Sequence, residues 1–175
     1  QKKLVNRSIL INSEGRIQSI YDKIHLFDVN INKNETHRES HSFIKGHKKV
    51  LSAIKGVKIG MTICYDLRFP SLYRYLAKKG AQIILIPAAF TVPTGKAHWD
   101  TLVRARAIEN TVFVVATNMC GKHHSGRLTY GNSVLYDPWG DIKNKCFTRT
   151  KIINTTLDLS IISKTRNKIP SLNNC

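Results

Sequence analysis

The sequence predicts an α/β domain built around a mixed β-sheet. Residues 82–87 and 112–117 are continuous apolar runs, which are typical of strands buried on both faces. Segments with helical spacing alternate with these runs, so strands and helices follow one another in the middle of the chain. Hairpin-forming segments near both ends indicate that antiparallel strands border the parallel ones. With 175 residues, 42% of them hydrophobic, the chain is long enough to bury one core.

Local patterns predict the individual elements. Turn residues at Asn12-Ser13-Glu14-Gly15 and at Asp137-Pro138-Trp139-Gly140 predict two hairpins. Pro70 and Gly80 bracket a segment with helical spacing. Residues 28–49 hold few large apolar side chains and predict a long loop. The predicted strands span 4–11, 17–23, 57–64, 82–87, 112–117, 130–136, 142–147 and 151–159, and the predicted helices span 71–80 and 97–110, followed by a basic, partly helical tail at 162–175.

The chain is strongly basic. Lysine and arginine outnumber acidic residues by 28 to 11, which gives a formal net charge of +17 and is compatible with binding to nucleic acid or an anionic membrane. However, the longest basic runs are only pairs, at Lys2-Lys3, Lys48-Lys49 and Lys78-Lys79. No apolar run approaches the roughly 20 residues of a membrane-spanning helix. We therefore interpret the charge as a bias towards lysine and predict neither a nucleic-acid nor a membrane partner.

Cysteine usage indicates a reducing compartment. Cys64, Cys120, Cys146 and Cys175 are scattered, and no pair has the C-x-x-C spacing of a zinc finger or a thioredoxin motif. No basic-then-apolar leader precedes them, so we expect a cytoplasmic protein. The chain begins with Gln rather than Met, which is compatible with its being part of a longer protein.

Two motifs point to chemistry. In ICYDLRFP, residues 63–70, Cys64 ends an apolar strand just before a helix, where backbone N–H groups favour a thiolate and can bind an oxyanion. Taken alone, a cysteine in this position is more commonly a small buried side chain at a strand end. In YDKIHLFD, residues 21–28, Lys23 follows a strand and opens the predicted loop. Taken alone, Lys23 could be a solvated lysine.

Together the two motifs resemble those of the nitrilase superfamily of carbon–nitrogen hydrolases. The lysine of the family stands in a YxKxHLFD motif and its cysteine in a GxxICYDxRFP motif, which here begins at Gly60. The segment CGKHH at 120–124, before YGNS, resembles the deaminated glutathione amidase branch more than the omega-amidases. The resemblance covers about residues 5–172, and the further matching segments are 87–90, Gly95, 97–99, 104–109, 130–133 and 137–140.

The resemblance implies a fold and a mechanism. The fold is an α-β-β-α sandwich with mixed sheets, a single domain over residues 1–175 that is truncated at its N-terminal end. Cys64 is implied to attack an amide carbonyl and to form a thioester, which water then hydrolyses. Lys23 and the backbone N–H of Tyr65 are implied to stabilise the oxyanion, and Glu39 to orient Lys23 and the attacking water.

The same resemblance implies how a substrate is held. Arg68, Phe90 and Thr94 match positions that bind a 2-oxo dicarboxylate-type substrate, such as an ω-amide of a small 2-oxo acid. The Arg68 guanidinium suits a carboxylate, although an ion pair with Asp66 is an equal alternative. We also considered zinc at Cys120, His123 and His124, but no distant fourth ligand accompanies them. We predict neither a metal nor a cofactor.

One expected residue has no counterpart in this chain. The family's general-base glutamate precedes the lysine by a long way, whereas Glu14 and Asp22 are the acids before Lys23, and neither matches it. Losing a general base costs about 10²–10⁴-fold in rate. The alternative to an amidase is therefore an inactive remnant that acts as an assembly or binding subunit, and a homo-oligomer is possible through helices flanking the sheet.

Overall fold

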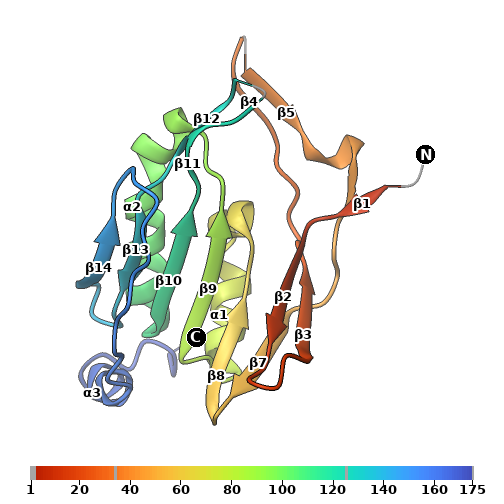
Figure 1. The fold of residues 1–175 in the computed structure, drawn as a ribbon. Coiled ribbons are helices and arrows are strands. Elements are labelled where there is room, and N and C mark those ends of the chain that lie inside the picture. The colour runs from red at the N-terminus through yellow and green to blue at the C-terminus, as the bar shows by residue number, and fades with distance from the viewer. Residues whose placement is uncertain (1–2, 34, 125, 175) are drawn as a thin grey trace.

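The computed structural model describes residues 3–33, 35–124 and 126–174. Its centre is a six-stranded mixed sheet, shown face-on in Figure 1, with the strand order β14-β13-β10-β9-β8-β7. The three middle strands β10, β9 and β8 run parallel, and antiparallel strands border them on both sides. The strands are β7 (Val50–Ile54), β8 (Val57–Met61), β9 (Ile83–Ala88), β10 (Phe113–Asn118), β13 (Ser133–Tyr136) and β14 (Ile142–Cys146).

The predicted β-α-β-α-β order is confirmed. Helix α1 (Pro70–Lys78) connects β8 to β9, and helix α2 (Val92–Asn110) connects β9 to β10. Proline stands in the first turn of both helices, where its missing N–H costs no hydrogen bond. Because Pro93 already lies in that first turn, α2 begins five residues earlier than the predicted start at residue 97.

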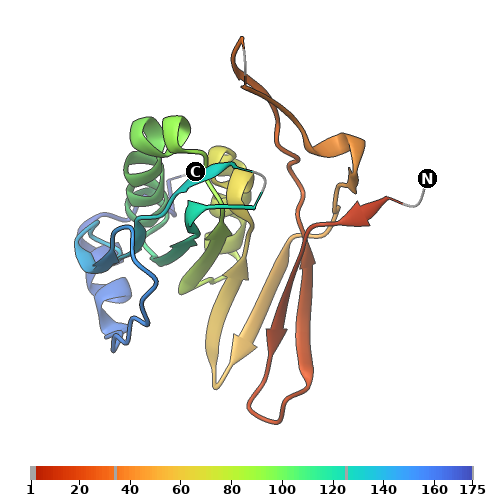
Figure 2. The ribbon, with the colours of Figure 1, turned by 45° about the horizontal axis from the view of Figure 1, so that its top comes forward.

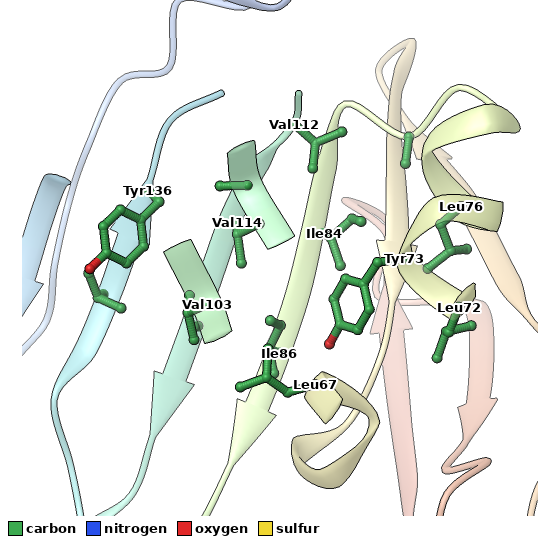
Figure 3. Packing of buried hydrophobic residues seen from close by; sticks show 14 of the residues in the cluster. Leu67, Leu72, Tyr73, Leu76, Ile84, Ile86, Val103, Val112, Val114 and Tyr136 are labelled. Atoms are coloured by element: carbon green, nitrogen blue, oxygen red, sulfur yellow. The ribbon is translucent and has the colours of Figure 1, made fainter. Parts of the chain in front are cut away.

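The main core lies between the sheet and these two helices. Alternate residues of β9 and β10, such as Ile84 and Val114, point to the same face and meet α1 and α2. On α1, Leu72 and Leu76 are spaced by one helical turn and pack onto this face (Figure 3). Trp99, on α2, is fully buried in the same cluster. The alternation of side chains along the strands therefore places apolar residues on the face of the sheet that α1 and α2 cover.

The opposite face of the sheet has a different cover. Helix α3 (Ser160–Lys168) packs there against Phe113 and Leu135 through Ile162. The hairpin of β2 (Arg7–Ile11) and β3 (Ile17–Asp22) stands beside β7 at the edge of the six-stranded sheet (Figure 2). This hairpin and the sheet enclose between them the cavity described below.

Both hairpins predicted from turn residues are confirmed, as β2–β3 and β13–β14. The predicted loop at 28–49 is wrong in part, because it folds into an antiparallel pair, β4 (Asp28–Asn32) and β5 (Glu35–Arg38), and the 3₁₀ turn η1 (Glu39–His41). Its strand β6 (Phe43–Ile44) then pairs with β1 (Leu4–Val5). Too few large apolar residues mark these short polar strands for the hydrophobic pattern to show them.

The predicted last strand at 151–159 is also wrong, because these residues have no strand partner. Leu157 and Leu159 instead pack as an irregular segment beside α3. Two further short strands, β11 (Cys120–Lys122) and β12 (Leu128–Tyr130), were missed; they form a small antiparallel pair at the end of β10. None of the helices in the described ranges is both long and apolar enough to cross a lipid bilayer.

Gly95 provides a test of the contact between α2 and β12. A Cβ atom at this buried position would overlap the Cβ and Cγ atoms of Tyr130. Gly95→Ala gains about 1 kcal/mol of helix propensity, but overpacking costs about 1–3 kcal/mol, so we expect a net loss of stability. Chemical denaturation measures the loss, with the exposed neighbour Lys96→Ala as a control that stays near wild type. A G95A variant more stable than wild type would contradict this packing.

Candidate active site

Cys64 stands at the beginning of a tight turn that follows β8. The 3₁₀ turn η2 (Cys64–Arg68) starts three residues after the strand, and α1 follows at Pro70. The backbone of Cys64 adopts φ = 48°, in the left-handed region that non-glycine residues rarely occupy. Such a conformation persists only where the surrounding structure holds it, and it is enriched at functional sites. The sulfur lines a cavity rather than being sealed in the core.

Lys23 and Glu39 form a buried ion pair beside the same cavity. The Lys23 Nζ atom lies 2.6 Å from Oε2 of Glu39, and their side chains are 3% and 13% exposed. The backbone N–H of Phe27 donates to the same oxygen at 2.6 Å, and the Asn6 amide donates to Oε1 at 3.0 Å. Burial alone would raise the pKa of Glu39, but these three hydrogen bonds outweigh it and leave the pKa lowered. The sequence prediction that Glu39 orients Lys23 thus has its contact in the structure.

Asp66 connects the lysine segment to the cysteine turn. Its fully buried carboxylate accepts hydrogen bonds from the Tyr21 hydroxyl at 2.6 Å and from the Ile63 N–H at 2.9 Å. The other oxygen accepts the His25 N–H at 3.1 Å and lies 2.7 Å from His25 Nδ1. Tyr21 and His25 flank Lys23, and Ile63 precedes Cys64. One carboxylate therefore fixes both segments, a role that the sequence did not reveal.

The surroundings of Cys64 set its ionisation. Burial raises the pKa of the thiol. The Lys23 ammonium, the backbone N–H of Ala89 and the Arg127 guanidinium act in the opposite direction, but the pKa remains above the ordinary value. A neutral thiol therefore prevails at neutral pH, and attack on a carbonyl requires a group that takes its proton.

The cavity brings together most of the predicted site residues. It has a volume of about 1320 Å³ and lies between the β2–β3 hairpin, the lysine and cysteine segments, and the ends of β9 and β10. This is larger than the roughly 300–1,000 Å³ of ordinary small-ligand pockets. Thr94 hydrogen-bonds Thr91 at 2.8 Å, and the Phe90 ring packs edge-on against Trp99. The predicted residues among its lining are Lys23, Glu39, Cys64, Tyr65, Phe90 and Thr94.

Arg68 is placed differently from these. It is not among the residues that line the cavity. Its Nη1 and Nη2 atoms both lie 3.3 Å from Nδ1 of His98, and its guanidinium stands over the rings of Tyr65 and Phe90. The alternative ion pair with Asp66 is not formed, because Asp66 is bonded to Tyr21, His25 and Ile63. A role of Arg68 in binding substrate stays a prediction.

The structure adds residues that sequence reasoning missed. Asn6, which donates to Glu39, lies between β1 and β2, where a single Asn between Val5 and Arg7 gives no sequence signal. Arg127 lies in the connection between β11 and β12 and lines the cavity. Within the described part of the chain, no three His, Cys, Asp or Glu side chains gather as a metal-binding group. The ring of His123, considered above as a ligand, lies 3.0 Å from the Thr129 hydroxyl.

Comparison with known proteins places this site in a family. The family model described as "Carbon-nitrogen hydrolase" matches residues 1–167. The chain belongs to the carbon–nitrogen hydrolase family. It is 40% identical over 172 residues to a deaminated glutathione amidase of Synechocystis and 40% identical over 171 residues to one of Bos taurus. Each alignment covers 97% of this chain, but only 63% and 52% of those relatives, so the chain spans about half to two thirds of their length.

Solved structures of the nitrilase superfamily share the fold. The NitFhit protein of C. elegans superposes with a TM-score of 0.92 and 37% identity, over 99% of this chain and 42% of that one. The amidase of Nesterenkonia sp. AN1, also of this superfamily, superposes with a TM-score of 0.70 and 26% identity, over 81% of this chain and 51% of that one. The structure of that amidase shows covalent addition of an acetamide moiety at its active-site cysteine. The predicted nitrilase-type α/β fold is confirmed.

The Lys23–Glu39 pair of this carbon–nitrogen hydrolase chain predicts a pH-dependent stability. Since the pKa of Glu39 in the folded state lies below its ordinary value of 4.5, its stabilisation is present above that value and is lost as pH falls through the lower folded-state pKa. Glu39→Gln leaves the buried Lys23 ammonium without its countercharge, so we expect the unfolding free energy at pH 7 to fall by about 3 kcal/mol.

Urea denaturation from pH 7 to pH 3 measures this effect. The difference between wild type and E39Q should begin to shrink as the pH falls below the ordinary value of 4.5, and should go on shrinking towards the lower folded-state pKa. Glu14→Gln is the matched control. The Glu14 side chain is 65% exposed, and its ion pair with Arg16 is long, at 3.6 Å. A difference that persists unchanged at pH 3 would show that charge is not the cause.

The buried hydrogen bonds of Asp66 predict a second loss of stability. An asparagine amide would direct an NH₂ group towards donors, so Asp66→Asn leaves buried donors without an acceptor and should cost about 3 kcal/mol of stability. Asp28→Asn is the control, because Asp28 is an exposed carboxylate that accepts the Ser40 N–H and should cost about 1 kcal/mol or less. Urea denaturation measures both losses. Equal losses in the two variants would refute the conclusion that Asp66 holds the lysine and cysteine segments together.

Proposed function

We propose that the protein to which this chain belongs is a thiol-dependent amidase with Cys64 as its nucleophile. The observation that most directly supports this proposal is that Cys64, whose backbone is in the left-handed region, lines the same cavity as the buried Lys23–Glu39 pair. Membership of the carbon–nitrogen hydrolase family and the active-site cysteine of the Nesterenkonia amidase support the same residue. An inactive remnant is not favoured, because the chain retains Cys64, Lys23 and Glu39 and all three line one cavity.

In the proposed reaction, Cys64 Sγ attacks the carbonyl carbon of an amide. The carbonyl oxygen becomes an oxyanion, which the Lys23 ammonium and the backbone N–H of Tyr65 stabilise. The carbon–nitrogen bond then breaks, the nitrogen leaves with a proton as ammonia or an amine, and a thioester remains on Cys64. Water attacks the thioester, releases the carboxylic acid and restores the thiol. Glu39 fixes the direction of Lys23 throughout and orients this water.

The proposed substrate is the ω-amide of a small 2-oxo acid, such as deaminated glutathione. The names of the relatives from Synechocystis and Bos taurus support this choice. Phe90 and Thr94 line the cavity and supply an apolar surface and a hydroxyl group. Arg68 stands over the Phe90 ring at 5.7 Å and is the third proposed substrate contact. The reaction requires no cofactor, and we propose that it takes place in the cytoplasm.

Cys64→Ala in the complete protein tests the proposal. Because the thiol forms the bond, we expect release of cysteinylglycine, the amine that leaves deaminated glutathione, to fall to background in C64A and to be unchanged in the control Cys175→Ala. Wild-type protein quenched with acid during turnover should gain the mass of the substrate less that of cysteinylglycine on the peptide that contains Cys64. Activity retained by C64A would overturn the assignment of the nucleophile.

A further inference from the structure

The cavity that contains Cys64 is lined by an excess of positive charge. Among the described residues, one acidic side chain lines it, that of Glu39. The lining basic residues are Arg7, Lys23, Arg38, Arg127, Arg149 and Lys151. An imbalance of this kind, within a cavity that has low-dielectric walls, raises the local concentration of anions and disfavours cationic substrates. The net charge of the whole chain has the same sign but is spread over the surface, whereas this charge is concentrated beside the nucleophile.

Three of these six basic groups have partners that hold them in the protein. Lys23 is paired with Glu39, and Arg7 forms a two-bond ion pair with Asp22 at 2.7 and 2.9 Å. Arg38 donates to the backbone carbonyls of Val29 and His37 and to the side chain of Asn30. These three cations are thereby fixed as part of the scaffold of the cavity.

Arg127 differs from them in both position and partners. Its Nη2 group donates to the Ala89 carbonyl oxygen at 2.6 Å, and among the described residues no carboxylate lies within ion-pairing distance. Ala89 and Arg127 line the same cavity as Cys64, and both act to lower the pKa of its thiol. A guanidinium carries five N–H donors, so one hydrogen bond to Ala89 leaves a fork available for a ligand.

We propose that Arg127 binds the carboxylate of an anionic amide substrate, and that it does so in preference to Arg68. The substrate class rests on the proposed amidase function, whereas the binding of a carboxylate by Arg127 does not. Arg68 does not line the cavity, and both of its terminal nitrogens face His98. The Ala89 hydrogen bond holds Arg127 in one orientation, which lowers the entropy lost when a carboxylate binds. A carboxylate held here leaves the other end of the substrate free to place its amide at Cys64.

A pair of thiol reagents tests this without requiring hydrolysis. N-Ethylmaleimide and 3-maleimidopropionic acid react with a thiol in the same way and differ by a carboxylate on a chain of similar length. The rates of modification of Cys64, followed by peptide mapping with mass spectrometry at low ionic strength, give the ratio of acid to neutral reagent. We expect Arg127→Gln to lower this ratio about tenfold, the effect of losing one charge-assisted hydrogen bond.

Two further variants make the result specific. Arg16→Gln removes an exposed charge from the β2–β3 turn, outside the cavity lining, and should leave the ratio unchanged. Arg68→Gln should change it less than R127Q does. If R127Q slows both reagents equally, Arg127 supports the cysteine structurally and the proposal is wrong. If R68Q lowers the ratio and R127Q does not, the carboxylate belongs to Arg68 and the proposal is overturned.

Amide hydrolysis by the complete protein then separates this inference from the proposed function. With deaminated glutathione, R127Q should raise KM about tenfold and leave kcat nearly unchanged, because the contact is made equally in the bound and reacting states. A protein that hydrolyses no amide but shows the tenfold change in reagent ratio would refute the amidase function and retain the anion site. Hydrolysis with an unchanged ratio and an unchanged KM in R127Q would refute the anion site alone.

Discussion

The buried carboxylate of Asp66 is the constraint on which the geometry of the site depends. It accepts hydrogen bonds from residues on either side of Lys23 and from the residue that precedes Cys64. The Tyr21 hydroxyl remains protonated and available as a donor, because burial and the adjacent carboxylate raise its pKa. Asp66 lies two residues beyond Cys64, whose left-handed backbone would relax without such a hold. The sulfur and the ammonium are thus located relative to each other by a group that contacts neither.

The central fold could be predicted from the sequence because its strands are buried on both faces. Runs such as 82–87 and 112–117 are apolar throughout, and the helices between them show a regular apolar spacing. The segments whose structure was predicted wrongly lack this apolar signal. Residues 28–49 are polar strands in small two-stranded pairs, so their pairing depends on neighbours distant in sequence. The segment 151–159 has strand-like alternation, but its apolar side chains pack beside α3 without a partner strand.

Residues of the site could be predicted from the sequence only where a recognisable motif contained them. Cys64, Lys23 and Glu39 were proposed from a family resemblance, and the structure brings Lys23 and Glu39 into contact. Asp66 lies within the cysteine motif, yet its spacing allowed a local ion pair with Arg68 as readily as the long-range bonds that it forms to Tyr21 and His25. Asn6 and Arg127 carry no motif at all. Their roles depend on which side chains face one cavity, and that is a property of tertiary structure alone.

The hydrogen bonds of Glu39 also decide which groups can take the thiol proton. Both of its oxygens already accept bonds, from Lys23 and Phe27 on one side and from Asn6 on the other. A base must give up such partners when it becomes protonated, and the lowered pKa of Glu39 measures how unfavourable that is. Since burial raises the pKa of Cys64, transfer from the thiol to Glu39 is opposed at both ends. We therefore propose that Glu39 serves as the fixed countercharge of Lys23 and that another base takes the proton of Cys64.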